Sequence, residues 1–190
     1  KGYLASIGWF TAFDNQQAVD ADGQPIPWVT YSFIDFIKTR LTKDLTIFEY
    51  GSGNSTLFYA KNVKKVVSVE HDEAWFNKIV TAKASNAEMI FTPLEKDGEY
   101  AKKASLLGEK FDVIIVDGRD RVNCCKHSIS ALTVNGVLVL DDSEREFYEE
   151  ARTFLTLNGF KELPFTGISP GLFYNKTTSV FYKADNCLGI

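Results

Sequence analysis

Cysteine, methionine and long apolar runs are all scarce in this chain of 190 residues. Two of the three cysteines, Cys124 and Cys125, are neighbours. Adjacent cysteines rarely bridge each other, so no disulfide framework is expected. Free thiols are typical of a reducing compartment, which predicts a cytoplasmic protein. No apolar run approaches the ~20 residues of a membrane-spanning helix, so no membrane span is expected.

The chain also lacks a basic stretch. Lysine and arginine number 21 against 25 aspartates and glutamates, and the net charge is -4. This balance argues against nucleic acid as the partner and favours a small molecule. The length suits one domain with a full core. Because the chain begins at Lys1 rather than at a methionine, the sequence leaves any upstream segment open. It also leaves a homo-oligomer open.

The most informative stretch runs from Thr46 to Glu70. A short apolar run closes with Glu49 and is followed by the turn GSGNST, which starts at Gly51. A helical stretch comes next, and a β-branched run then ends on Glu70. Strand, glycine loop, helix, strand and acid form one βαβ unit of the kind that holds a nucleotide.

Each part of this unit has a physical reason. Gly51 and Gly53 let the backbone turn tightly and approach a ligand without a Cβ in the way. The loop runs into a helix N-terminus, whose free N–H groups attract a polar or anionic group. Glu70 lies 19 positions after Gly51. A carboxylate there can accept hydrogen bonds from both hydroxyls of a ribose.

The identity of the nucleotide depends on the sixth position of the loop. Dinucleotide-binding loops place a third glycine there, and this chain has Thr56. The loop instead resembles motif I of class I S-adenosylmethionine-dependent methyltransferases. Another nucleotide-binding enzyme and a coincidental turn are the alternatives. The resemblance implies that Glu49 lies near the amino-acid end of the ligand, Glu70 binds its ribose and His71 lies beside the adenine. The loop residues expected to bind this cofactor are Gly51, Ser52, Gly53, Asn54 and Ser55.

Residues 1–27 show no clear periodicity, and we expect an N-terminal arm or lid before a single domain over residues 28–190. Apolar residues at helical spacing predict a helix from Trp28 to Leu41. The preceding segment GQPIPWVTY resembles one found before motif I in bacterial methyltransferase-like proteins. That resemblance implies cofactor contacts for Thr30 and Tyr31. Helix capping and core packing are the alternative roles.

The end of the chain predicts the sheet topology. The segments Phe160–Phe165 and Thr178–Tyr182 alternate like strands, which predicts an antiparallel pair after the fifth expected strand. Class I methyltransferases end in this way. The resemblance, which now covers about Gly23 to Lys183, implies an α/β, three-layer Rossmann-like fold. Its seven-stranded, mostly parallel sheet would have the order 3-2-1-4-5-7-6 and an antiparallel C-terminal hairpin.

The fourth expected strand, Phe111–Asp117, delivers charged residues to the ligand-binding edge. Asp117 is the first candidate for handling the acceptor proton or positioning the acceptor. Arg119 and Arg121 follow it, where they could bind an acidic acceptor such as a uronic acid. A solvated charged loop is the alternative.

Asp141 and Asp142 end the fifth expected strand, beside Asp117. Three carboxylates at one edge suit Mg²⁺ or Ca²⁺, so they predict a metal site. The arrangement resembles metal-dependent O-methyltransferases that act on catechols or sugar hydroxyls. The alternative is that Asp142 or Ser143 caps a helix predicted over Glu144–Leu157.

These patterns together predict an S-adenosylmethionine-dependent methyltransferase. We expect it to methylate oxygen of a small molecule or glycan precursor, with Asp117, Arg119 and Asp142 as catalytic residues. One rival is an aminopropyltransferase on the same fold, which the run after Asp117 resembles loosely. The other is a non-catalytic module that binds S-adenosylmethionine.

Overall fold

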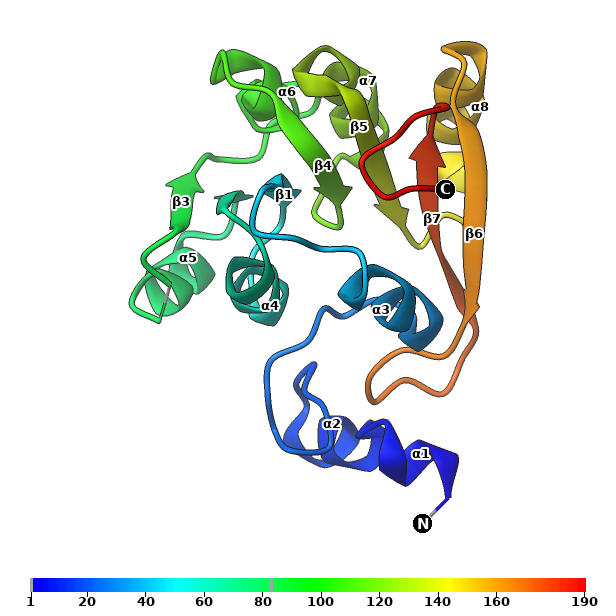
Figure 1. The fold of residues 1–190 in the computed structure, drawn as a ribbon. Coiled ribbons are helices and arrows are strands. Elements are labelled where there is room, and N and C mark those ends of the chain that lie inside the picture. Colours follow the sequence, from blue (N-terminus) through cyan, green and yellow to red (C-terminus); the bar gives the residue numbers. More distant parts are fainter. Residues whose placement is uncertain (1, 83) are drawn as a thin grey trace.

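A seven-stranded sheet forms the centre of the protein in the computed structural model, which describes residues 2–82 and 84–190 (Figure 1). The strand order is β3-β2-β1-β4-β5-β7-β6, which confirms the predicted order. Strands β1 to β5 are parallel, and β7 runs antiparallel to both of its neighbours. The strands are β1 Thr46–Tyr50, β2 Lys65–Glu70, β3 Ala87–Phe91, β4 Phe111–Val116, β5 Leu132–Asp141, β6 Lys161–Gly167 and β7 Lys176–Tyr182.

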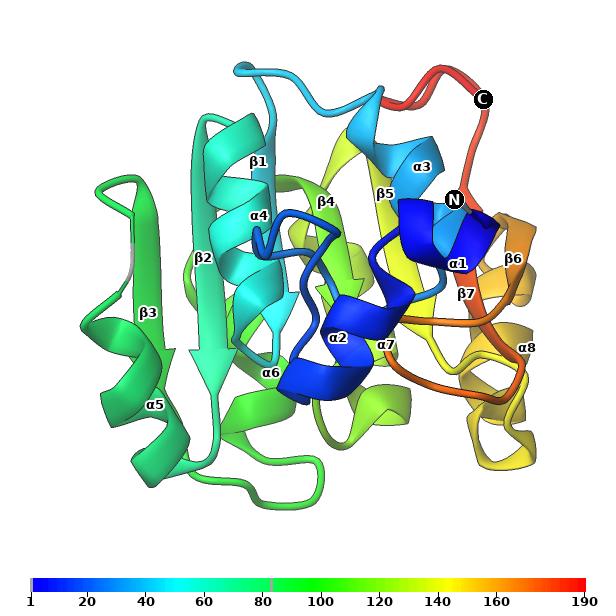
Figure 2. The same ribbon diagram turned by 90° about the horizontal axis from the view of Figure 1, so that it is seen from below.

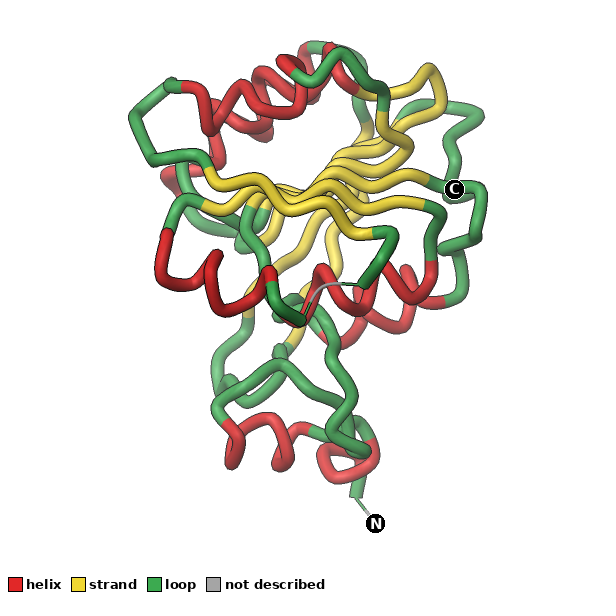
Figure 3. Tube along the Cα trace, turned by 90° about the vertical axis from the view of Figure 1, so that its left-hand side faces the viewer, coloured by secondary structure: helices red, strands yellow, loops and turns green. Residues whose placement is uncertain are grey.

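Helices cover both faces of the sheet, which gives the three layers that were predicted (Figures 1 and 3). Helices α3, α4 and α5 lie on one face, and α6, α7 and α8 on the other. The helices are α1 Tyr3–Ser6, α2 Trp9–Asn15, α3 Tyr31–Lys38, α4 Asn54–Asn62, α5 Glu73–Val80, α6 Glu99–Leu106, α7 Arg121–Ser128 and α8 Glu149–Leu157, with 3₁₀ turns at Ile129–Ala131 and Glu146–Tyr148.

The alternation of side chains along each strand divides the core in two. In β1, Ile47 packs in the cluster under α3 and α4, whereas Phe48 and Tyr50 pack in the cluster under α6 and α7. All three side chains are fully buried. A strand that is covered on both faces has a nearly continuous run of apolar residues. Such runs allowed β1 and β4 to be predicted from the sequence.

Two predicted helices begin later than expected. Helix α3 starts at Tyr31 rather than Trp28, because Thr30 is still extended and occupies the N-cap position. Helix α8 starts at Glu149 rather than Glu144, after a 3₁₀ turn. Ser143 is not a cap. Its hydroxyl is 2.7 Å from Ser179 Oγ and its N–H donates to Thr177 O at 2.9 Å, so it binds β7.

The N-terminal arm, residues 2–27, contains α1 and α2 and lies beyond the layer of α3 and α4 (Figures 1 and 2). Aromatic packing holds it to the loop between β6 and β7. Trp9 stacks on Phe13 with 5.3 Å between ring centres and meets Phe173 at 4.7 Å. Its indole N–H donates to Leu172 O at 3.1 Å. The arm therefore has a defined position over one end of the sheet.

Two expectations from composition can be checked directly. All three cysteines are free thiols. Within residues 2–82 and 84–190, none of the helices is long and apolar enough to span a membrane.

The buried side chains of β1 are expected to dominate stability. Phe48→Ala should lower the free energy of unfolding by about 3–5 kcal/mol, because it leaves a cavity between β1 and α6. The matched control is Leu157→Ala, since Leu157 is 81% exposed. That change should stay within about 0.5 kcal/mol. Urea unfolding of both variants measures the difference, and equal losses would contradict the assigned core.

Candidate active site

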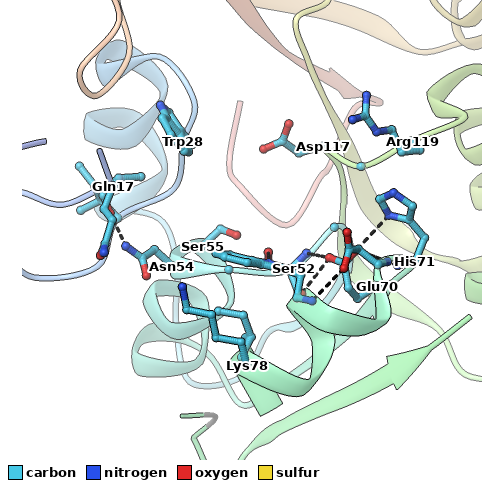
Figure 4. A pocket seen from close by; sticks show the side chains of 18 of the residues that line it. Gln17, Trp28, Ser52, Asn54, Ser55, Glu70, His71, Lys78, Asp117 and Arg119 are labelled. Carbon is cyan, nitrogen blue, oxygen red and sulfur yellow. Dashed lines mark hydrogen bonds and ion pairs between the residues drawn. The ribbon is translucent and has the colours of Figure 1, made fainter. Parts of the chain in front are cut away.

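A pocket of about 690 Å³ opens at the carboxyl ends of β1, β2 and β4 (Figure 4). This volume lies within the range of small-molecule and cofactor sites. It also lies where the strand order reverses between β1 and β4, the usual ligand position in open α/β sheets. Its walls come from the arm, the glycine loop, the end of β2, helix α5 and the loop after β4. The lining residues are Gln16, Gln17, Ala18, Ile26, Trp28, Gly51, Ser52, Gly53, Asn54, Ser55, Glu70, His71, Asp72, Trp75, Lys78, Ile79, Asp117, Gly118, Arg119 and Arg121.

The glycine loop touches the loop that follows β4. Gly51 has a φ of +88°, and a Cβ there would lie 3.1 Å from Gly118 Cα. A Cβ on Gly118 would lie 2.1 Å from the hydroxyl of Tyr100, which is fully buried. Both positions therefore require glycine, one for its conformation and one for space. The two backbones meet without side chains at the floor of the pocket.

Glu49 supports the glycine loop from below. Its carboxylate accepts hydrogen bonds from Thr56 Oγ1 at 2.6 Å and from Ser68 Oγ at 3.0 Å. Thr56 Oγ1 in turn accepts from the N–H of Gly53 at 3.1 Å. Burial raises the pKa of Glu49 to about 7, although the surrounding hydroxyls oppose this shift. Only 1% of Glu49 is exposed, so it positions the loop rather than lining the pocket.

Glu70 joins the end of β2 to the same loop. One of its oxygens accepts from the N–H of Ser52 at 3.1 Å and from Ser52 Oγ at 3.0 Å. The other accepts from the backbone N–H groups of His71 at 2.7 Å and Asp72 at 2.9 Å. The two Ser52 bonds therefore tie the glycine loop to the end of β2.

Helix α5 forms the wall below Glu70. Asp72 caps it by accepting from the N–H of Trp75 at 2.9 Å. The indole N–H of Trp75 donates to Ser52 O at 2.8 Å, and Lys78 lies 5.0 Å from the indole ring. Above this wall the ring of His71 meets Tyr100 edge-on at 5.8 Å between ring centres. An aromatic and cationic surface therefore surrounds the Glu70 end of the pocket.

Asp117 brings a carboxylate to the opposite wall (Figure 4). Its side chain keeps 24% exposure toward the pocket and is 3.0 Å from the guanidinium of Arg121. Surrounding protein atoms and repulsion by Asp141 raise the pKa of Asp117, against the opposing charges of Arg121 and Lys176. An aspartate with a raised pKa is a better proton acceptor than an ordinary one.

The predicted metal site is not supported, because Lys176 stands where the ion would. Its ammonium contacts Asp141 Oδ2 and lies 2.9 Å from Asp142 Oδ1. Arg145 lies 2.9 Å from the other Asp142 oxygen. Among the residues that the structure describes, no group of three or more histidines, cysteines, aspartates and glutamates is arranged to hold a metal ion.

Most of the predicted site residues gather in the pocket. Gly51, Ser52, Gly53, Asn54, Ser55, Glu70, His71, Asp117 and Arg119 all line it.

The remaining predicted residues lie outside the lining. Asp142 is 5% exposed and paired with cations, so its position does not support the predicted catalytic role. Thr30 is fully buried, and its hydroxyl donates to Phe165 O at 3.1 Å. Tyr31 is a buried residue of the core under α3. The alternative role in packing therefore describes Thr30 and Tyr31 better than cofactor contact.

Several lining residues escaped the sequence reasoning. Gln16, Gln17 and Trp28 reach the pocket only because the arm folds back over the glycine loop. Asn54 marks this contact, since its side-chain amide donates to Ala18 O at 2.9 Å. Lys176 was missed because the last strand was predicted to start two residues later, at Thr178. The signal that could have revealed Lys176 was the antiparallel direction of this last strand, because such a strand begins at the edge where the parallel strands end.

Comparison with known proteins places this geometry in a fold family. The sequence matches no protein-family model and no curated protein. Its structure resembles a methyltransferase-like protein from Silicibacter pomeroyi, with a TM-score of 0.61 and 21% identity over 84% of this chain and 89% of that one. It also resembles a precorrin-6y C5,15-methyltransferase from Geobacter metallireducens, with a TM-score of 0.62 and 14% identity over 90% of this chain and 96% of that one. The fold is that of class I S-adenosylmethionine-dependent methyltransferases.

The methyltransferase-fold neighbours differ in what they act on. An O-methyltransferase from Bacillus cereus in complex with SAH has a TM-score of 0.61 and 14% identity over 78% of each chain. An rRNA methylase from Streptococcus thermophilus has a TM-score of 0.53 and 15% identity over 78% of this chain and 92% of that one. The fold therefore leaves the acceptor undecided, and only the site can narrow it.

Glu49 should make stability depend on pH. An acid whose pKa is raised on folding keeps its proton while the unfolded chain releases it. Stability then falls as pH rises from about 4.5 to about 7 and levels off above that. Glu49→Gln should remove this loss, which is roughly 3 kcal/mol, and leave the variant more stable than wild type at pH 8. Thermal unfolding at pH 5 and pH 8 measures it.

The control for this experiment is Glu146→Gln, because Glu146 is exposed. It should leave the pH dependence unchanged. A Glu49→Gln variant that loses stability equally at both pH values would show that the glycine loop needs an ionised carboxylate.

Proposed function

We propose that this protein binds S-adenosylmethionine in the pocket and transfers its methyl group to oxygen of a small molecule or glycan precursor. The observation that carries the proposal is the meeting of the glycine loop, Glu70 and Asp117 around one pocket at the strand-order reversal. The methyltransferase fold supports the same assignment.

The residues present suit this cofactor. Glu70 provides carboxylate oxygens for the ribose hydroxyls, and His71 provides a ring beside them. The glycine loop leads into the N-terminus of α4, whose first two residues, Asn54 and Ser55, line the pocket. When bound, the sulfonium supplies an activated methyl group, so the protein needs only to place the acceptor and remove its proton.

Asp117 is the group proposed to contact the acceptor. It reaches the pocket from the end of β4, and its raised pKa suits it to accept a proton from a hydroxyl. Gln17 of the arm and Trp28, which directly follows the arm, close the pocket, which would exclude water from the reacting atoms. Arg119 is exposed at the rim, where it could meet an acidic group of the acceptor.

The free thiols of Cys124, Cys125 and Cys187 are compatible with the cytoplasmic location that we propose.

Glu70 provides the direct test of cofactor binding. Glu70→Ala should weaken S-adenosylmethionine or S-adenosylhomocysteine roughly ten- to a hundredfold, about 1.5–3 kcal/mol, because the ribose hydroxyls lose a charged acceptor. Calorimetry measures the dissociation constants, and NAD should give no heat. Tight NAD binding without a response to either sulfur compound would overturn the proposal.

Ser52→Ala is the matched control, because it breaks the Ser52–Glu70 side-chain bond and keeps the carboxylate. It should change the affinity by less than about threefold. Equal losses in both variants would mean that Glu70 only holds the loop. Screening hydroxyl acceptors, and decarboxylated S-adenosylmethionine with polyamines, then separates a methyltransferase from an aminopropyltransferase or a module without turnover.

A further inference from the structure

A cluster of ion pairs lies behind the wall of the pocket that carries Asp117. It contains three carboxylates and three cations: Asp117, Asp141, Asp142, Arg121, Arg145 and Lys176. Arg121 connects two of the carboxylates, since its guanidinium lies 3.0 Å from Asp117 and 3.3 Å from Asp142. Lys176 connects Asp142 to Asp141. Arg145 completes the group from the exposed side. The formal charges cancel, so the cluster needs no further ion for neutrality.

Lys176 holds the central place in this cluster. Only 5% of it is exposed, and Asp141 is 1% exposed. Thr178 Oγ1 donates to the second Asp141 oxygen at 2.7 Å, so this carboxylate is fully engaged. Lys176 stands at the first position of β7, and Asp141, at the end of β5, pairs with Thr178. The antiparallel last strand therefore brings the ammonium to the carboxyl edge of the parallel strands.

We propose that Lys176 is a built-in cation that takes the place of a divalent metal at this edge and positions Asp117 through Asp142 and Arg121. One ammonium contacts two adjacent carboxylates, as a bound Mg²⁺ or Ca²⁺ would. Two buried carboxylates beside each other are costly unless they are paired, which gives the lysine a physical role. The assignment rests on these contacts and not on the proposed reaction.

The proposal narrows the acceptor class, and this step does rest on the proposed function. A divalent ion with open positions can hold two acceptor oxygens at once. The Lys176 ammonium is buried between Asp141 and Asp142 and has no open position toward the pocket. The acceptor should therefore present one nucleophilic group to Asp117 rather than a chelating pair of adjacent hydroxyls.

Removing the lysine should create a metal site. In Lys176→Ala, the freed Asp141 and Asp142 should bind Ca²⁺, and 10 mM Ca²⁺ should raise the melting temperature by about 5 °C at constant ionic strength. Wild type should respond no more than to matched NaCl. The control is Lys65→Ala, because Lys65 likewise lies between two carboxylates, Glu88 at 3.3 Å and Glu109 at 2.9 Å, but its side chain is 33% exposed. It should gain no such response.

A second measurement covers the case in which Lys176→Ala does not fold. Lys176→Met combined with Asp141→Asn should be more stable than Lys176→Met alone, because cation and anion leave together. A double variant no more stable than the single one would overturn the proposal. The proposal would also be overturned if Ca²⁺ raised the melting temperature of wild type more than matched NaCl does. The same holds if a folded Lys176→Ala variant showed no stabilisation by Ca²⁺.

These outcomes are separable from the proposed function. If wild type fails to bind S-adenosylhomocysteine, the cofactor assignment fails while the Ca²⁺ result stands. If the cofactor binds and the best acceptor is a catechol methylated only with Mg²⁺, the role of Lys176 fails and the methyltransferase assignment stands.

Discussion

The close contact between two backbone turns, at Gly51 and Gly118, is the constraint on which the rest of the site depends. The two turns follow β1 and β4, the neighbouring strands between which the strand order reverses. Helices on opposite faces then leave an opening between them. Because no Cβ lies between the turns, the opening reaches down to the strand ends. The glycine loop, Glu70 and Asp117 all surround this opening, so a side chain at either glycine would disturb each of them.

Buried charge organises the two sides of the pocket differently. On the β2 side, Glu49 and Glu70 are satisfied by hydroxyls and backbone N–H groups. On the β4 and β5 side, carboxylates are neutralised by Arg121 and Lys176. One side is thus built to recognise polar groups, and the other to keep a single carboxylate, Asp117, in contact with the pocket.

The arm makes the pocket deeper than the sheet alone could. Trp9 and Trp28 donate to carbonyl groups of the β6–β7 loop, and Ala18 accepts from Asn54 of the glycine loop. The arm is therefore connected both to the segment expected to bind the cofactor and to the far end of the sheet.

The resemblance to class I methyltransferases implied the strand order, and the sequence by itself determined the strands, the glycine loop and the gathering of Gly51, Glu70 and Asp117. These features depend on local signals: apolar runs that form buried strands, glycines that allow a turn, and acids at strand ends. Only the tertiary structure decided what surrounds them. Gln17 comes from the arm, Trp28 directly follows the arm, and Lys176 comes from the antiparallel strand β7. Such contacts join residues that are distant in the sequence, as Lys176 and Asp141 do, which lie 35 positions apart. No local pattern encodes the pairing of Lys176 with Asp141 and Asp142. The sequence alone therefore predicted a metal site at the three acids, and the structure places the lysine where the ion would bind.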